Sequence, residues 1–261
     1  MFRSLHIAAT GMAAQETQLE GVSNNIANVN TTGYKRQRVE FQDLLYQTVR
    51  GAGTRTTETT RSPTGIQLGS GVRVAGTSRS FSQGTILMTN NPLDVAIEGA
   101  GFFTVQQSDG TEAYTRAGAF QKDSQGQLVT TEGNLIEPPI VIPLDAVSLT
   151  IAADGTVSAV MNGQPAPVEV GQLTIATFIN PSELSAQGRN LFTATTASGE
   201  AQTGEPGSDG RGALLQGALE RANVDVVEEM IGMISAQRAY EVNTKVVTTA
   251  DEMLRAATQM K

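Results

Sequence analysis

Apolar side chains recur every seven residues near the start of the chain, at Leu5, Met12, Leu19 and Ile26. A neighbouring track with the same spacing contains Val22 and one polar fault at Gln15. This periodicity is typical of an amphipathic helix whose apolar stripe packs against another helix. We therefore predict a long helix at the N-terminus.

The end of the chain repeats the pattern, and its apolar positions are again seven residues apart. They are Val226, Met233, Tyr240, Val247 and Leu254. Neither predicted helix has a helical partner nearby in the sequence. The simplest arrangement is that the two terminal helices pack on each other as a coiled-coil-like pair.

The predicted N-terminal helix carries unusually little charge. Between Ser4 and Tyr34 the formal charges are Glu16 and Glu20, and the other polar residues are mostly Ser, Thr, Gln and Asn. A solvated helix face normally carries many charged residues. The pattern favours a face that another molecule covers, although an ordinary pair of terminal helices folded onto a core is the alternative.

The middle of the chain has the signals of strands. Apolar and polar residues alternate in stretches such as "LDVAIEG" and "VSLTIAADGTVSAV", and alternation indicates strands with one buried face. Asp109-Gly110, Asp154-Gly155 and Asn162-Gly163 are dipeptides that favour tight hairpin turns. The predicted fold class is α+β, with a β-rich domain inserted between the two terminal helices.

These patterns suggest a division of the chain into domains. We expect a discontinuous helical assembly domain (1–40 and 213–261), an extended arm or loop (41–71), a β-rich outer domain (72–195) and a linker (196–212). The arm is rich in Thr and Gly from residue 51 onward, which is typical of loops and edge strands.

Composition narrows the function classes. The formal net charge of −8 disfavours a nucleic-acid surface, because binding to phosphates needs clustered Lys and Arg. The chain has no cysteine, which excludes disulfides, thiol catalysis and zinc bound by Cys. No cleavable signal peptide and no membrane-spanning run of about 18 apolar residues is visible.

Candidate catalytic chemistry is sparse. His6 is the single histidine and lies between Leu5 and Ile7, whereas a Ser-His-Asp triad or a metal site needs several converging groups. Pairs of carboxylates could support glycoside hydrolysis, but the Asp residues lie largely at turns. We expect no enzyme activity, no cofactor, no metal and no small-molecule substrate; a carbohydrate-acting secreted enzyme is the weaker alternative.

Three segments resemble a known family. "SNNIANVNTTGYKR", "NPLDVAIEGAGFFTVQ" and "NVDVVEEMIGMISAQRAYEVNTKVVTTADEML" are similar to the N-terminal, middle and C-terminal segments of the flagellar rod, hook and hook-associated axial proteins. The three matches occur in the family's order and cover most of the chain. The length and the Gly/Thr-rich arm favour a distal rod component, with another rod or hook axial protein as the alternative.

The resemblance implies a structural subunit of the bacterial flagellar distal rod, which polymerises into a rigid hollow helical shaft that transmits torque from motor to hook. It also implies export through the flagellar channel without a cleaved signal peptide, and a position in the basal body where the rod crosses the periplasm. The implied partners are further copies of the chain, neighbouring rod proteins, the hook protein and the surrounding rings. Nucleic acid is not among them.

The asparagine-rich segment after the first helix is predicted to be a joint through which the chain leaves the helix pair. Asn and Gly tolerate left-handed backbone conformations, and Asn side chains bond to nearby backbone groups. The residues expected to take part in subunit assembly are Leu5, Met12, Leu19, Val22, Ile26, Asn28, Asn30, Gly33, Tyr34, Val226, Met233, Tyr240, Val247 and Leu254.

Overall fold

The structure, a computed structural model, describes residues 2–52, 63–162 and 166–259. The chain forms two compact units. The first, here the helical unit, comprises Met1–Ile26, Gln37–Ser78 and Val226–Lys261. The second, here the β-rich unit, comprises Ala27–Arg36 and Arg79–Asp225.

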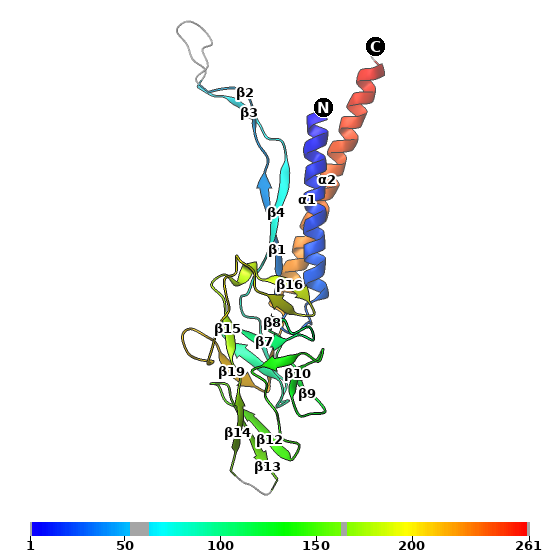
Figure 1. Cartoon of the computed structure of the whole chain (residues 1–261). Helices are drawn as coiled ribbons and strands as arrows, with labels where there is room; N and C mark the ends of the chain where they lie inside the picture. Colours follow the sequence, from blue (N-terminus) through cyan, green and yellow to red (C-terminus); the bar gives the residue numbers. More distant parts are fainter. Residues whose placement is uncertain (1, 53–62, 163–165, 260–261) are drawn as a thin grey trace. The chain divides into compact units, whose positions relative to one another are not determined.

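The helical unit is built on two long helices, α1 (Phe2–Ala27) and α2 (Val226–Gln259). They run antiparallel, since Gly11 lies against Asn243 and Val22 lies against Gly232. Figure 1 shows the two helices side by side. The predicted pair of packed terminal helices is confirmed. Neither helix, over its described residues, is long and apolar enough to cross a membrane.

A two-stranded ribbon completes the helical unit. β1 (Gln37–Asp43) pairs with β4 (Val72–Arg79), and farther along β2 (Gln47–Arg50) pairs antiparallel with β3 (Ile66–Leu68). Residues 41–71, expected to form an extended arm or loop, therefore contain paired strands. Positions 53–62 of that arm lie outside the described residues.

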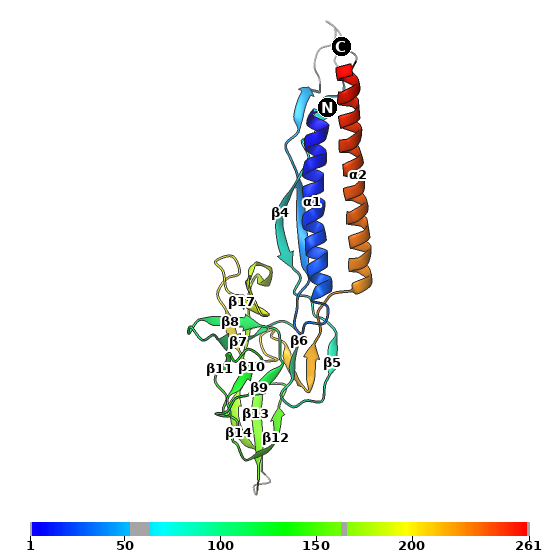
Figure 2. The ribbon, with the colours of Figure 1, turned by 90° about the vertical axis from the view of Figure 1, so that its right-hand side faces the viewer.

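The ribbon packs along one side of α1, and α2 packs along another (Figure 2). Val39 of β1 is buried against Gly21, where an added Cβ would lie 3.1 Å from the Val39 Cγ2. Near the start of α1, Arg3 donates hydrogen bonds to the Gln47 side chain (2.9 Å) and the Leu68 carbonyl (2.6 Å). Because an isolated two-stranded ribbon is marginally stable, these contacts with α1 support it.

The β-rich unit contains most of the strands. The largest sheet among the described residues has nine strands, all of its pairs being antiparallel. Its main order is β16 (Ser185–Gly188), β17 (Leu191–Thr193), β8 (Glu112–Thr115), β7 (Phe102–Gln106), β11 (Leu135–Glu137), β10 (Leu128–Thr130) and β9 (Phe120–Lys122). From this path, β15 (Ile175–Thr177) pairs with β7 and with β18 (Gln202–Gly204).

Smaller sheets accompany the largest one. They are formed by β12 (Ala146–Ile151), β13 (Thr156–Met161) and β14 (Val168–Gln172); by β6 (Val95–Glu98) and β19 (Ala213–Gln216); and by β5 (Ile86–Met88) and β20 (Ala218–Glu220). A short 3₁₀ helix, η1, spans Pro181–Glu183. The predicted β-rich region between the helices is confirmed.

Alternating apolar residues of these strands form one large core, because side chains of a strand point alternately to its two faces. Its most deeply buried members include Val95, Phe103, Val105, Val157, Leu173 and Ile175. The predicted hairpin turns at Asp109-Gly110 and Asp154-Gly155 connect β7 with β8 and β12 with β13. Gly163 of the third predicted turn lies outside the described residues.

The strands near the C-terminal helix differ from the expected division. Residues 196–212, expected as a linker, include β18, and residues 213–220, grouped with the helix, form β19 and β20. Gly217, with φ of 72°, separates these last two strands. The helix α2 begins at Val226, where the alternating pattern of β19 and β20 has ended.

Candidate functional site

The seam between α1 and α2 is made of small residues. Gly11 faces Asn243 so closely that an added Cβ would lie 2.9 Å from the Asn243 Nδ2, and Gly232 faces Val22. On α2 the alanines Ala236 and Ala250 are buried. Small residues at facing positions let two helix backbones approach closely, so the pair is held by close packing with little large apolar area between the helices.

One polar side chain, Asn25, sits buried at this seam and connects three segments of the helical unit. Its Nδ2 donates to the buried Glu229 Oε2 on α2 (3.2 Å) and to the Gln37 carbonyl (2.9 Å). Its Oδ1 accepts a hydrogen bond from the Gln37 N–H (2.9 Å). A buried Asn between helices favours the one register in which its hydrogen bonds form. Asn25 therefore fixes how α1, α2 and the start of β1 line up.

The predicted assembly residues of α2 do not lie at the centre of the seam. Met233, Val247 and Leu254 are half-buried, whereas Val226 and Tyr240 are exposed. The buried positions Glu229, Ala236 and Ala250 come three residues after Val226, Met233 and Val247. The reason is steric: the closest line between the helices accepts small residues, and the large apolar side chains flank it.

The predicted residues of α1 and of the joint are distributed in a similar way. Val22 is buried, and Leu5, Met12, Leu19 and Ile26 are half-buried. Beyond the helix, Gly33 and Tyr34 are buried, Asn28 is half-buried and Asn30 is exposed. Asn25 was absent from the predicted set, although its place in a low-charge heptad helix was a sign of a buried polar contact.

The first turns of α2 expose a group of large apolar side chains. Val227, Met230, Ile231 and Ile234 are between 52% and 66% exposed. They lie on the side of α2 away from the seam residues Glu229 and Ala236, as the 3.6-residue period requires. Contiguous exposed apolar surface of this kind marks an interaction site. The helical unit thus presents a face suited to a protein partner.

The joint, residues 27–36, belongs to the β-rich unit. It begins with a turn in which the Thr31 N–H donates to the Asn28 carbonyl (3.0 Å) and the Thr31 hydroxyl lies 3.2 Å from Asn28 Oδ1. Later in the joint, the Arg36 N–H donates to the Asn223 Oδ1 (2.7 Å). Asn28 therefore takes part in the turn with its backbone carbonyl and its side-chain oxygen, whereas the asparagine that holds Arg36 is 187 positions away in the sequence.

Gly33 lies in the joint where the backbone of another segment approaches closely. Its φ of +69° lies in the left-handed region, and its N–H donates to the Glu220 carbonyl (2.9 Å). A Cβ at this position would lie 2.7 Å from both the Ala117 nitrogen and the Arg116 carbonyl carbon. Glycine is therefore required for two separate reasons, backbone conformation and space.

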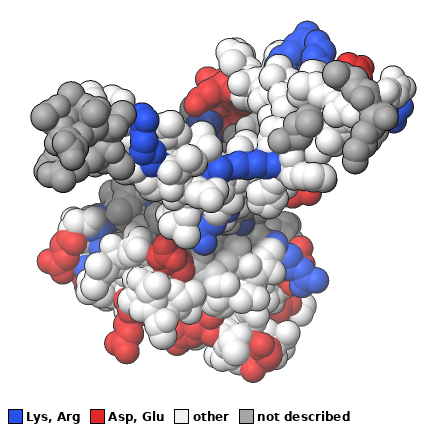
Figure 3. All heavy atoms as spheres, turned by 90° about the horizontal axis from the view of Figure 1, so that it is seen from above, with Lys and Arg blue, Asp and Glu red and all other residues white. Residues whose placement is uncertain are grey.

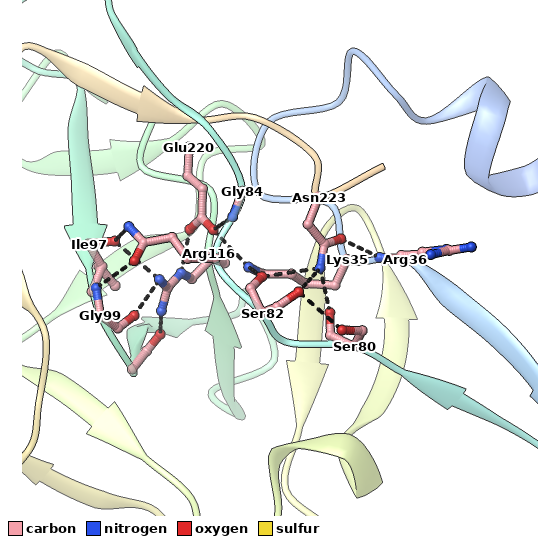
Figure 4. A network of polar contacts seen from close by, with 12 residues as sticks. Lys35, Arg36, Ser80, Ser82, Gly84, Ile97, Gly99, Arg116, Glu220 and Asn223 are labelled. Atoms are coloured by element: carbon pink, nitrogen blue, oxygen red, sulfur yellow. Dashed lines mark hydrogen bonds and ion pairs between the residues drawn. The ribbon is translucent and has the colours of Figure 1, made fainter. Parts of the chain in front are cut away.

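A buried ionic network secures the joint within the β-rich unit (Figure 4). Glu220 Oε1 accepts hydrogen bonds from Lys35 Nζ (2.8 Å) and from the Gly84 N–H (2.7 Å), and Glu220 Oε2 accepts one from Arg116 Nε (2.5 Å). The side chains of Lys35, Arg116 and Glu220 are at most 4% exposed. The network joins the joint to β20 and to the residue that follows β8.

The two cations have further partners, so the network is closely satisfied. The Arg116 guanidinium also donates to the carbonyls of Gly101 (2.5 Å), Gly99 (2.5 Å) and Ile97 (3.1 Å). Lys35 Nζ donates in addition to the Ser82 carbonyl (2.8 Å). Buried charges are tolerated when they are paired and hydrogen-bonded in this way. The arrangement holds a chain segment in place and leaves no free group for acid–base chemistry.

The surroundings of Glu220 act on its pKa in opposite directions. Burial raises the pKa of Glu220, but the charges of Arg116 and Lys35 and their hydrogen bonds outweigh burial and leave it lowered. Burial lowers the pKa of Lys35; Glu220 opposes this change and Arg116 adds to it.

Sequence reasoning missed this network, although one signal was present. Glu220 falls between Ala218 and Ala222 at alternate positions, and all three are buried. A carboxylate on the buried side of an alternating strand predicts a buried partner of opposite charge. Arg116 and Lys35 come from distant parts of the chain, so the sequence alone did not indicate which cations would meet it.

The described residues contain no group of three or more His, Asp or Glu side chains that could hold a metal ion. His6, the sole histidine, is exposed on α1. Charged side chains lie scattered between uncharged ones on the face shown in Figure 3. The two features that the described residues show most clearly are structural. They are a helix pair with an exposed apolar face and a joint held by hydrogen bonds and buried ion pairs.

Comparison with known proteins decides the family. Three family models match the chain: flagella basal body rod protein (residues 5–35), flagellar hook protein FlgE/F/G D1 domain (96–159) and flagellar basal body rod FlgEFG protein C-terminal (215–260). The flagellar basal-body rod protein FlgG of Caulobacter vibrioides is 49% identical over 99% of both chains. The chain belongs to the FlgG family of flagellar basal-body rod proteins.

Other FlgG proteins agree over the full length. The one from Borreliella burgdorferi is 49% identical over 100% of this chain and 99% of its own, and the one from Bacillus subtilis is 40% identical over 100% of both. Membership of the FlgG family makes the chain a structural subunit of the flagellar rod. The predictions of a distal rod subunit without enzymatic activity are confirmed.

Replacing Gly33 with Ala tests the joint. The substitution should lower the free energy of unfolding of the β-rich unit by more than about 3 kcal/mol, because the strain of a positive φ adds to the clash with residues 116 and 117. Urea unfolding followed by near-ultraviolet circular dichroism measures the change. Gly110→Ala is the control, since Gly110 has a φ of +83° but open space around it; it should cost about 1 kcal/mol. Equal costs at both positions would contradict the close packing of Gly33.

The Glu220 network should make the β-rich unit sensitive to acid. The pKa of Glu220 in the folded chain lies below its ordinary value of 4.5. The ionised carboxylate therefore stabilises the fold fully above about pH 4.5, and this stabilisation is lost as the pH falls through the folded-state pKa. The urea concentration at the midpoint of unfolding, measured at pH 7, 5 and 3, should fall between pH 5 and pH 3.

The matched variant is Glu220→Gln. Its free energy of unfolding at pH 7 should be about 3–5 kcal/mol lower than that of the wild type, because two buried cations lose their counter-ion. Its midpoint should also change less than the wild-type midpoint between pH 5 and 3. Glu132→Gln, at an exposed ion pair with Arg189, is the control and should change little. A Glu220→Gln chain with wild-type stability and acid sensitivity would refute the role of the network.

Proposed function

We propose that copies of this chain polymerise into the rigid, hollow, helical shaft of the distal rod, which transmits torque from the motor to the hook. The exposed apolar face of α2 at Val227, Met230, Ile231 and Ile234 is the main support for this proposal. Four neighbouring apolar side chains on one helix are costly to leave in water, so a neighbouring subunit that covers them gains stability.

The form of the helical unit supports assembly of a head-to-tail kind. Its exposed apolar residues also occur on the ribbon, where Leu45 is 89% and Val49 is 60% exposed. A contact between two different surfaces of identical subunits can repeat from copy to copy, and it produces a helical filament when the rotation between copies does not close into a ring. The ribbon extends the reach of each copy along its neighbours, as the predicted arm would.

The wider setting is proposed from the family. The rod built by this chain crosses the periplasm, the chain is exported without a cleaved signal peptide, and the polymer meets neighbouring rod proteins, the hook protein and the surrounding rings. The FlgE/F/G domain shared with hook proteins supports end-to-end continuity between rod and hook, since related subunits can form related contacts.

Polymerisation of the purified full-length chain tests the proposal. The wild-type chain should form sedimentable particles above a threshold concentration, and electron microscopy should show straight tubes. The double variant Ile231→Ser/Ile234→Ser should raise the threshold at least about tenfold, because two apolar contacts of about 1 kcal/mol or more each are lost.

The control is Leu144→Ser/Val147→Ser, which removes two apolar side chains of similar exposure, 74% and 71%, from the β-rich unit. It should leave the threshold within about twofold. A wild-type chain that stays monomeric at all concentrations, or an α2 variant that polymerises as the wild type does, would refute the proposed role of this face.

A further inference from the structure

One face of α1 has no partner within the described helical unit. The helix contacts α2 on one side, through residues such as Gly11 and Val22, and the ribbon on another, through Gly21. By the helical period of 3.6 residues, a third face remains. The exposed residues of this third face are Phe2, His6, Ala9, Ala13, Glu16 and Glu20.

The third face is acidic near its middle. Glu16 and Glu20 lie one turn apart, and the structure gives neither carboxylate an ion pair among the described residues. Two like charges at this spacing repel each other weakly. A cation placed beside them would remove that repulsion, so the face is complementary to a basic side chain.

A groove with a volume of about 250 Å³ lies next to Glu20, between α1 and the base of the ribbon. Its wall includes Thr17, Glu20, Asn24, Gln37 and Thr77. These side chains offer oxygen atoms that accept hydrogen bonds from an ammonium group. The groove is open to solvent and polar, and the carboxylate of Glu20 gives it a negative charge.

The helical unit also carries a cation that lacks a partner. Among its described residues, each arginine holds at least one hydrogen bond or ion pair: Arg3 with Leu68, Arg38 with Glu40, Arg50 with Thr64, Arg73 with Gln42, Arg238 with Glu241 and Arg255 with Asp251. The structure records no such contact for the side chain of Lys245, which is exposed on α2. Glu241, one turn away, is already engaged by Arg238.

Lys245 and Glu20 cannot meet within one chain. In the antiparallel pair, Asn25 lies against Glu229 and Val22 against Gly232, so Glu20 lies at the level of residue 234. Lys245 is eleven residues farther along α2, a distance of about 16 Å at 1.5 Å per residue. It also points away from the seam, because it follows the seam residue Asn243 by two positions, or about 200° of helix rotation.

We propose that Lys245 of one copy enters the Glu20 groove of a neighbouring copy in the polymer. The inference rests on the proposed polymerisation and names one contact within it: the third face of α1 against the outer face of α2, with the Lys245 ammonium between Glu20 and the polar groove wall. The two surfaces are different parts of one subunit, so each copy donates one lysine and accepts another. This is the heterologous pattern that a helical polymer requires.

Charge exchange tests the contact. Glu20→Lys and Lys245→Glu should each raise the threshold concentration for polymerisation about tenfold, because each places like charges together. The double variant Glu20→Lys/Lys245→Glu should return the threshold to within about twofold of wild type. Glu169→Lys, a charge reversal at an exposed position of β14 in the β-rich unit, is the control and should change the threshold less than twofold.

Cross-linking gives a second, independent measurement, which the absence of cysteine from the chain makes simple. A Glu20→Cys/Lys245→Cys chain treated with a short bismaleimide under polymerising conditions should give a ladder of covalent multimers. A Glu20→Cys/Arg255→Cys chain, whose second cysteine lies on another face of α2, should give at least about tenfold less.

The outcomes separate this contact from the proposed function. If wild type does not polymerise, the proposed function fails and the contact fails with it. If wild type polymerises but the single charge reversals have wild-type thresholds, or the double variant is no better than the singles, the contact is refuted while the proposed function stands. Equal cross-linking by the two cysteine pairs refutes it as well.

Discussion

The close approach of α1 and α2 along a line of alanine and glycine is the contact on which the helical unit depends. Facing pairs such as Gly11 with Asn243 and Gly232 with Val22 bring the backbones together but bury few large side chains. Since burial of apolar area is the main source of stability, such a pair is modestly stabilised on its own. Other large apolar residues, such as Val227 and Ile231, are left exposed on the outer face of α2.

Polar contacts have a corresponding role in each unit. A helix pair with open faces needs its register to be fixed by something other than bulk apolar packing, and in the β-rich unit the joint is held by buried charges. Asn25 supplies the register with hydrogen bonds to Glu229 and Gln37, and the Glu220 network holds Lys35 in the joint. Polar contacts of this kind are specific because a slipped arrangement would leave buried polar groups unsatisfied.

Much of this organisation could be predicted from the sequence. Heptad periodicity located both helices, and turn dipeptides and alternation located the β-rich insert, because these features depend on local chemistry. The cover predicted for the low-charge face around Glu16 and Glu20 stays a prediction. The heptad track through Val226 and Tyr240 identified an apolar stripe, but periodicity does not indicate how closely two helices approach, so the line of small residues in the seam was not predicted.

Features that depend on distant parts of the chain could not be predicted. The Thr and Gly content of the arm favoured a loop or an edge strand, but it gave no indication that residues 47–50 would pair with residues 66–68, or residues 37–43 with residues 72–79. The partners of Glu220 are 104 and 185 positions away in the sequence. Contacts at that separation are set by the fold as a whole, so no local pattern reveals them.

If neighbouring copies complete the helical unit, as proposed, hydrogen exchange of the full-length chain will differ between the monomer and the polymer. Amides of α1 and α2 should exchange at least about 100-fold faster in the monomer than in the polymer, because the open faces lower the free energy of local unfolding. Amides of the core strands β7 and β8 should be equally protected in both. Full protection of residues 5–29 in the monomer, unchanged on polymerisation, would show that the helical unit is already complete in a single copy.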